Sequence, residues 1–231
     1  MSVSEQLSLV RSNVAEACRQ SGRHEESVRI IAVTKYGDVA FAKTAHDAGC
    51  LDLGESRPQA LWEKAAALSA CTPAPQWHLI GHLQRNKVRR TLQCDPFIHT
   101  VDSERLLTAI DREAAIQGRQ CDVLVEVNLS EDPRRSGVSL LESHALIRHA
   151  ASCQHVRVRG LMGMASFPTG NDPNGEARRQ FSTLRELRNS LRNELAIDDL
   201  VELSMGMSGD YMEAILEGAT MIRIGSALFK E

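Results

Sequence analysis

The sequence lacks the features that mark several protein classes. It has six cysteines but no CxxC pair, which argues against a zinc knuckle or a dithiol redox site. No apolar run approaches the roughly 20 residues needed to span a bilayer. The first ten residues, MSVSEQLSLV, show neither the basic nor the apolar segment of a secretory signal. We therefore expect a cytoplasmic protein with reduced, mainly buried cysteines.

An excess of charge of one sign is also missing. The net charge is −3 over 231 residues, which gives no electrostatic reason to expect nucleic acid or a membrane as a partner. The length fits one α/β barrel or two small domains. Because no linker, repeat or low-complexity tract divides the chain, we expect residues 1–231 to form one domain.

Short β-rich segments alternate with longer amphipathic segments after a first helix, which is predicted to begin at Ser4 and to end at Gly22. Most strand candidates are continuous apolar runs, as expected of parallel strands buried on both faces. The predicted strands are 29–34, 51–53, 76–80, 97–101, 123–128, 156–162, 200–204 and 221–224. The predicted helices between them lie near 38–49, 57–70, 84–93, 103–117, 139–151, 175–194 and 209–218. Their predicted N-caps include Asp38, Ser103, Ser139 and Ser208.

Eight strands separated by helices favour an α/β fold, a single (β/α)8 barrel of the TIM type with an extra N-terminal helix. The alternative is an open doubly wound sheet, which typically carries a glycine-rich fingerprint after its first strand. Here that strand is followed by Thr34-Lys35-Tyr36-Gly37, which is no such fingerprint. Barrel sites form at the carboxyl ends of the strands, and two polar loops, 130–137 and 166–175, are expected on that face.

Lys35 follows the apolar run IIAVT and is expected to point into the barrel mouth. A partly desolvated amine there can be neutral, and a neutral amine can attack an aldehyde. On the pattern alone, a solvated lysine at a strand end is the simpler interpretation.

The C-terminal third contains a predicted phosphate cradle. Ser208 precedes a predicted helix, whose N-terminus would offer free N–H groups to an anion. The Gly225-Ser226 turn after the last strand would add backbone donors. Ordinary capping explains either element alone, but the two together favour a phosphate site.

Arg223 lies within the last strand, in the run MIRIG, where a charge needs a partner. That partner is either a buried carboxylate or the ring nitrogen of a cofactor. Because an arginine stays charged, it would keep such a nitrogen unprotonated and weaken the ring as an electron sink.

Six motifs in order, spread over nearly the whole chain, resemble the pyridoxal phosphate homeostasis protein family, single-barrel proteins similar to the N-terminal domain of alanine racemase. The motifs are Ala32-Val33-Thr34-Lys35, Leu53-Gly54-Glu55, Trp77-His78-Leu79-Ile80-Gly81 with Leu83-Gln84 and Asn86-Lys87, Arg159-Gly160-Leu161-Met162, Leu203-Ser204-Met205-Gly206-Met207-Ser208 with Asp210, and Ile222-Arg223-Ile224-Gly225.

The resemblance implies that pyridoxal 5′-phosphate (PLP) is bound as a Schiff base on Lys35. It implies phosphate contacts from Ser208, Gly225 and Ser226, and it places Arg223 at the pyridine nitrogen. Three more residues near strand ends are expected to contact the cofactor: Ser56, His78 and Met207.

The chain departs from the family pattern in three places. Ser56 stands where the family usually has Asn, and a shorter side chain there would loosen a contact near the cofactor. Arg135 replaces a usual lysine in the loop that starts at Asn128. An arginine cannot form a Schiff base, which argues against a cofactor-transfer role tied to that lysine. Tyr36-Gly37 follows Lys35 where a more polar or proline-containing turn is expected.

Two functions from different classes remain open. One is a carrier that holds PLP for homeostasis without conventional turnover, with PLP-dependent apoenzymes as candidate recipients. The other is a PLP-dependent amino-acid racemase, which needs a second base on the opposite face of the substrate. Tyr36 is expected to point away from Lys35, as neighbours on a strand do, and Tyr211 lies in the predicted phosphate-site helix, so the carrier is favoured. A binding module without a Schiff base is a third possibility. A monomer or a weak homodimer is expected.

Overall fold

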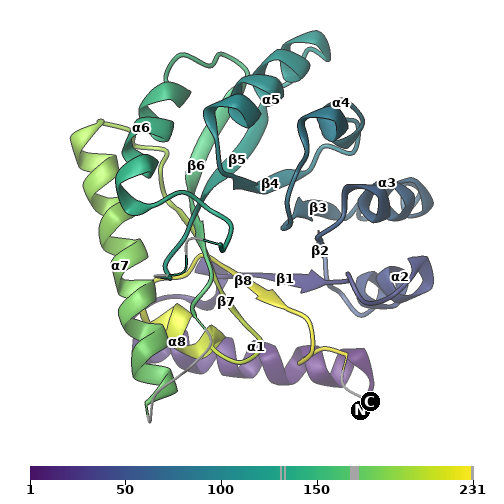
Figure 1. Ribbon diagram of the computed structural model, residues 1–231. Helices are drawn as coiled ribbons and strands as arrows, with labels where there is room; N and C mark the ends of the chain where they lie inside the picture. The colour runs from purple at the N-terminus through teal and green to yellow at the C-terminus, as the bar shows by residue number, and fades with distance from the viewer. Residues whose placement is uncertain (131, 133, 167–171, 230–231) are drawn as a thin grey trace.

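The eight predicted strands form a closed parallel barrel (Figure 1). The structure is a computed structural model that describes residues 1–130, 132, 134–166 and 172–229, so parts of both predicted polar loops lie outside the described residues. Each strand pairs with the next one in the chain, and the last pairs with the first. The single (β/α)8 barrel is confirmed, and the open sheet is excluded. The strands are β1 (Arg29–Val33), β2 (Asp52–Glu55), β3 (Gln76–Leu79), β4 (Phe97–Val101), β5 (Cys121–Val127), β6 (Val156–Gly163), β7 (Glu202–Met207) and β8 (Met221–Ile224).

Helices surround the barrel, and the N-terminal helix takes the place of an eighth outer helix. The helices are α1 (Val3–Gln20), α2 (Val39–Asp47), α3 (Pro58–Ala67), α4 (Val88–Leu92), α5 (Glu104–Ile116), α6 (Leu140–Ala150), α7 (Pro173–Glu194) and α8 (Tyr211–Leu216), with short 3-10 turns η1 (Glu25–Ser27) and η2 (Arg85–Lys87). In the described part of the chain β8 leads into a turn, not a helix. Helix α1 packs against α8 and reaches α2 (Figure 1). The Asn13 amide donates a hydrogen bond to the Tyr211 hydroxyl at 2.8 Å.

The first helix begins earlier than predicted, because Ser2 and not Ser4 caps it. The Ser2 hydroxyl accepts a hydrogen bond from the Glu5 N–H, and the Glu5 carboxylate accepts one from the Ser2 N–H at 2.7 Å. This reciprocal pair needs an acidic residue three positions after the cap, which Ser4 lacks. The predicted caps at Asp38, Ser103 and Ser139 are confirmed.

Strands β2 and β7 extend further toward their carboxyl ends than predicted. The run 51–53 was expected as a strand, but the ladder with β3 continues through Gly54 and Glu55. Likewise β7 continues past Ser204 to Met207, which pairs with Arg223 of β8. In β2, apolar content did not reveal the extension because Glu55 is charged and is buried against a partner elsewhere in the chain. In β7 the extension contains Gly206, whose positive φ of 91° is unusual for a strand.

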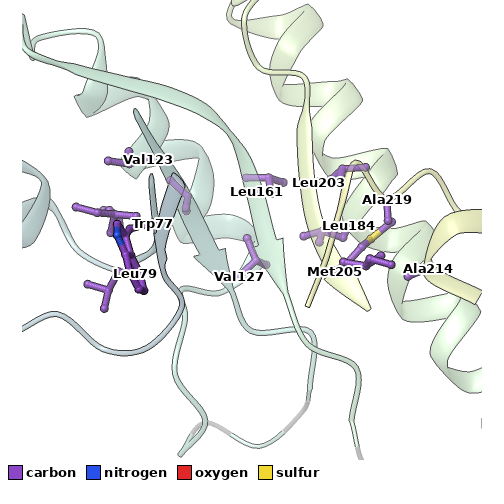
Figure 2. Close-up of a cluster of buried hydrophobic side chains, with 14 of the residues drawn as sticks. Trp77, Leu79, Val123, Val127, Leu161, Leu184, Leu203, Met205, Ala214 and Ala219 are labelled. Carbon is purple, nitrogen blue, oxygen red and sulfur yellow. The ribbon is translucent and has the colours of Figure 1, made fainter. Parts of the chain in front are cut away.

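Most of the apolar core lies between the strands and the outer helices. Figure 2 shows Leu203 and Met205 of β7 beside Leu184 of α7, with Leu161 of β6 next to them. All four side chains are fully buried. Burying one such side chain stabilises the fold by about 1.5–3 kcal/mol, so this layer holds the helices on the barrel.

The interior of the barrel is less apolar. A small cluster of inward-facing apolar side chains is formed by Ile31, Phe97, Leu124, Met162 and Met221. Buried polar side chains share the interior with them: His78, His99, Ser204 and Arg223. A buried polar group must find a hydrogen-bond partner to be tolerated, and these side chains lead from the interior to the site.

Two features are absent from the described residues. None of the helices among them is long and apolar enough to cross a membrane, and no three of their His, Cys, Asp or Glu side chains are grouped so that they could hold a metal ion. The six cysteines are free, as expected. Burial raises the pKa of the Cys50 thiol to about 11 and that of Cys121 to about 12, so both stay protonated at neutral pH.

Candidate functional site

A cavity of about 260 Å³ opens at the carboxyl ends of the strands. Small-molecule sites begin at about 300 Å³, so the cavity suits a compact ligand. Most of the predicted cofactor contacts line it: Lys35, Ser56, Met207, Ser208, Arg223, Gly225 and Ser226. His78 does not.

Lys35 lies in the turn after β1 and reaches into this cavity. Its ammonium lies 4.9 Å from the centre of the Tyr36 ring, a cation–π distance. In the described part of the chain it makes no hydrogen bond. The expectation that Tyr36 points away from Lys35 is wrong. Strand alternation stops at Val33, and both side chains belong to a turn that presents them to the same cavity.

Ser208 joins two loops and is not the predicted helix cap. Helix α8 begins at Tyr211, and its N-cap is Asp210. The Ser208 hydroxyl oxygen accepts hydrogen bonds from the N–H groups of Gly225 and Ala227, both at 3.2 Å. The sequence-based assignment failed because β7 runs on to Met207, which places Ser208 directly across from the last turn of the chain.

This arrangement leaves hydrogen-bond donors at one end of the cavity. Because the Ser208 oxygen accepts two hydrogen bonds, its own proton is available to donate. Among the described residues, no acceptor is seen for the Ser226 N–H. A hydroxyl and a backbone N–H beside each other are suitable donors for a phosphate oxygen. Gly209 adds room, since a Cβ placed there would touch nothing within 4 Å.

Arg223 brings a buried positive charge to the floor of the cavity. One terminal nitrogen, Nη1, donates to the Ser204 hydroxyl at 2.7 Å, and the other, Nη2, donates to the Gly163 carbonyl at 3.1 Å. Within the described residues no carboxylate forms an ion pair with it. Burial lowers the pKa of Arg223 to about 10, partly offset by the more distant Asp210 and Glu126, so the side chain stays charged at neutral pH.

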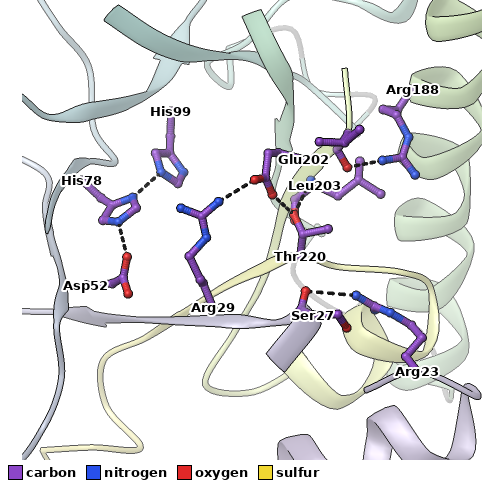
Figure 3. Close-up of polar contacts among 11 residues, drawn as sticks. Arg23, Ser27, Arg29, Asp52, His78, His99, Arg188, Glu202, Leu203 and Thr220 are labelled. Carbon is purple, nitrogen blue, oxygen red and sulfur yellow. Dashed lines mark hydrogen bonds and ion pairs between the residues drawn. The ribbon is translucent and has the colours of Figure 1, made fainter. Parts of the chain in front are cut away.

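A chain of hydrogen bonds continues from Arg223 into the barrel. The first link joins Ser204 Oγ to His99 Nδ1 at 2.8 Å. The next two, His99 Nε2 to His78 Nδ1 and His78 Nε2 to Asp52 Oδ1, are each 2.9 Å long and are drawn in Figure 3. Burial lowers the pKa of both histidines, so each carries one ring proton.

The two ends of this chain determine where the protons lie. Asp52 can only accept, so His78 donates from Nε2 and accepts at Nδ1. His99 must then donate from Nε2 and accept at Nδ1, where the Ser204 hydroxyl donates. Arg223 can only donate, which matches the remaining acceptor on Ser204. Every member of the chain is satisfied in this single arrangement.

His78 therefore lies beneath the cavity and not in its wall. It sits on β3 two residues before Ile80, which faces the same way and lines the cavity. Its link to the site runs through His99 and Ser204 to Arg223. Strand-end position in the sequence could not distinguish a side chain at the mouth from one a layer deeper.

Five further residues line the cavity but were not predicted as contacts: Val33, Tyr36, Ile80, Met164 and Gly209. Each is the last residue of a strand or lies within three positions after one, so the available signal was their position.

A second cavity, of about 240 Å³, lies at the opposite end of the barrel. Its arginines are neutralised: Arg29 pairs with Glu202 at 2.5 Å, and Arg157 pairs with Asp122 at 2.7 Å. The first pair is visible in Figure 3, where Glu202 also contacts Thr220. This end of the barrel holds a structural set of ion pairs.

Comparison with known proteins gives matches over the whole chain. Residues 6–231 match the family described as alanine racemase, N-terminal domain. A protein of Aquifex aeolicus named pyridoxal phosphate homeostasis protein is 34% identical over 100% of this chain and 99% of its own. A Synechocystis protein of the same name is 36% identical over 88% of this chain and 91% of its own.

Solved structures resemble the barrel closely. PipY of Synechococcus elongatus with PLP bound has a TM-score of 0.85 and 34% identity, covering 98% of this chain and 99% of PipY. An unknown protein of Bifidobacterium adolescentis has a TM-score of 0.90 and 34% identity, covering 98% and 94% of the two chains. An alanine racemase of Clostridium difficile has a TM-score of 0.74 at 15% identity, with this chain covering 57% of it, which shows the shared barrel fold alone.

Proposed function

The chain belongs to the pyridoxal phosphate homeostasis protein family, and on that premise we propose that it holds PLP reversibly in the mouth cavity as a Schiff base on Lys35, without conventional turnover. The observation that carries the proposal is that one cavity joins an amine, a pair of hydrogen-bond donors and a buried cation: Lys35, Ser208 with Ser226, and Arg223. These are the groups that an aldehyde, a phosphate and a pyridine nitrogen require.

Each residue has one task in this proposal. The neutral amine of Lys35 forms a C=N bond to the aldehyde carbon in place of the C=O bond, and one water leaves. The Ser208 hydroxyl and the Ser226 N–H donate to the phosphate, as their unused donors suggest. Arg223 donates to the ring nitrogen and keeps it unprotonated. Bound PLP supplies an electron sink, which an unprotonated ring weakens.

Two observations favour holding over racemisation. Tyr36 shares the turn of Lys35 and is 77% exposed, so it offers no second base fixed on the opposite side. The Tyr211 hydroxyl accepts a hydrogen bond from Asn13 of α1, which directs it away from the mouth. Racemisation requires two positioned bases, and the tyrosines of this chain do not supply the second.

The wider setting follows from the same proposal. We expect a cytoplasmic monomer or weak homodimer that exchanges PLP with PLP-dependent apoenzymes and binds no nucleic acid. Arg135 contacts the Ala165 carbonyl at 3.4 Å between two loops. Since an arginine cannot form a Schiff base, we propose that any exchange proceeds directly from Lys35.

The test is the absorption spectrum of the protein mixed with PLP, followed by borohydride reduction and mass spectrometry. Lys35→Ala should abolish the reducible band and the adduct, whereas Lys43→Ala, at an exposed lysine on α2, should keep both. A band that persists in Lys35→Ala would refute the proposal. Chiral chromatography after incubation with L-amino acids tests the alternative, and turnover above roughly 1 per second would establish a racemase.

A further inference from the structure

We infer that Lys64 and Glu55 are positioning residues for Lys35, fixing the turn that carries its amine. This inference rests on the proposed function. Neither residue lines the cavity. Lys64 lies on α3 and Glu55 at the end of β2, and both side chains are almost completely buried.

The Lys64 ammonium uses all three of its donors. It donates to the carbonyl oxygens of Thr34 and Gly37, each at 2.8 Å, and to the Glu55 carboxylate. Thr34 and Gly37 are the residues on either side of the Lys35-Tyr36 pair. One buried ammonium therefore holds the turn at both ends from behind.

Glu55 adds a second contact to this turn, and we call Lys64 and Glu55 together the clamp. The carboxylate oxygen Oε1 that contacts Lys64 also accepts a hydrogen bond from the Thr34 hydroxyl at 2.8 Å. Its other oxygen, Oε2, is buried and has no partner among the described residues. Lys64 is thus the one close counter-charge of this carboxylate in the described part of the chain, and the two residues depend on each other.

Lys35 needs this support because its own side chain has little. Its amine lies 4.9 Å from the centre of the Tyr36 ring and makes no hydrogen bond to a described residue. The position of the amine in the cavity consequently depends on the backbone of the turn. In a more mobile turn the amine would lie in the cavity only part of the time. The apparent affinity for PLP falls in proportion to the fraction of molecules whose amine lies in the cavity.

The experiment separates positioning from stability. Lys64→Met alone would leave the Glu55 carboxylate buried without a counter-charge. The main variant is therefore the double substitution Glu55→Gln with Lys64→Met, which removes both charges together. Thr34→Val is the milder second variant, removing only the hydroxyl contact. Glu217→Gln is the control, because it removes the charge of a largely buried carboxylate that pairs with Arg178 and Arg185 of α7, away from the turn.

Two readouts are taken on the full chain. Hydrogen–deuterium exchange without PLP should be faster in the peptide spanning 33–40 for the double variant, and less so for Thr34→Val, but unchanged for Glu217→Gln. The apparent dissociation constant for PLP, from the borohydride-trapped Lys35 adduct, should rise about tenfold or more in the double variant, with melting temperatures measured in parallel.

The outcomes are distinguishable. Exchange and PLP affinity equal to the wild type in both the double variant and Thr34→Val would overturn the positioning role. A loss of affinity shared by Glu217→Gln would also overturn it, since the effect would then follow general stability. If the wild type itself forms no Lys35 adduct, the proposed function fails, while the exchange measurement still tests the clamp.

Discussion

Acid should destabilise this protein partly through His99, and the substitution His99→Leu isolates that contribution. Burial holds the pKa of His99 well below its usual value, and the charge of the nearby Arg223 adds to the effect. The folded protein therefore keeps His99 neutral while the unfolded chain takes up a proton. By linkage, stability is lost as the pH falls below the unfolded pKa of about 6.5 and is regained above it.

The magnitude follows from proton uptake by the unfolded chain. Lowering the pH from about 8 to about 5.5 stabilises the unfolded state by about 1.4 kcal/mol for a histidine that stays neutral in the fold. For a chain of this size that corresponds to about 3–6 °C in melting temperature. Burial raises the pKa of Glu126 and Asp210, which gives the opposite slope, but these groups are present in both proteins and cancel in the comparison.

The assay is urea denaturation followed by circular dichroism at both pH values and one ionic strength. The wild type should lose about 1.4 kcal/mol more than His99→Leu between the two conditions, whatever fixed cost the leucine adds. His24→Leu, at an exposed position, should behave like the wild type. Equal losses in the wild type and His99→Leu would refute the neutral hydrogen-bonded chain through the barrel.

Three further outcomes are expected. Gly160→Ala should lower the free energy of unfolding, measured by urea denaturation, by about 1–3 kcal/mol or more, because the added Cβ would lie 1.9 Å from the Glu202 carbonyl oxygen. Gly209→Ala is the control, since a Cβ there meets nothing within 4 Å, and equal stability of the two variants would contradict the reasoning. Ser208→Ala should weaken PLP binding measured by calorimetry, and unchanged affinity would show that Ser208 does not contact the phosphate. The same variant should lose about 1 kcal/mol of stability, because the Gly225 and Ala227 N–H groups lose their acceptor. Tyr36→Leu should speed Lys35 adduct formation about two- to fivefold by removing the ring that stabilises the ammonium, and a slower reaction would show that the ring helps.

The polar chain inside the barrel also explains why His78 belongs to the motif set without touching the cavity. His78 fixes the tautomer of His99. His99 in turn accepts the Ser204 hydroxyl proton at Nδ1, which leaves a lone pair of the Ser204 oxygen for the Arg223 guanidinium. Arg223 is thereby held with two of its donors committed to protein. Its remaining N–H groups are the ones that a ligand in the cavity can use.

The sequence by itself determined the barrel and most of the mouth. Strand runs such as 97–101 and 221–224 match the structure because continuous apolar segments are a local consequence of burial on both faces. Lys35, Arg223 and Ser226 could be placed at the mouth because parallel strands bring their carboxyl ends to one side. These inferences need only the order of residues within each strand and the handedness of the connections.

Only the tertiary structure decided which polar groups meet. The Lys64 contact with Thr34 spans 30 residues, and the Ser208 contact with Gly225 spans 17. The depth of His78 depends on its contact with His99 across the strand ladder. Such pairings arise when the barrel closes and sets the stagger of its strands, and no local periodicity encodes them. For that reason the sequence could place Lys35 at the mouth, whereas the buried contacts of Lys64 and Glu55 behind it became visible only in the folded chain.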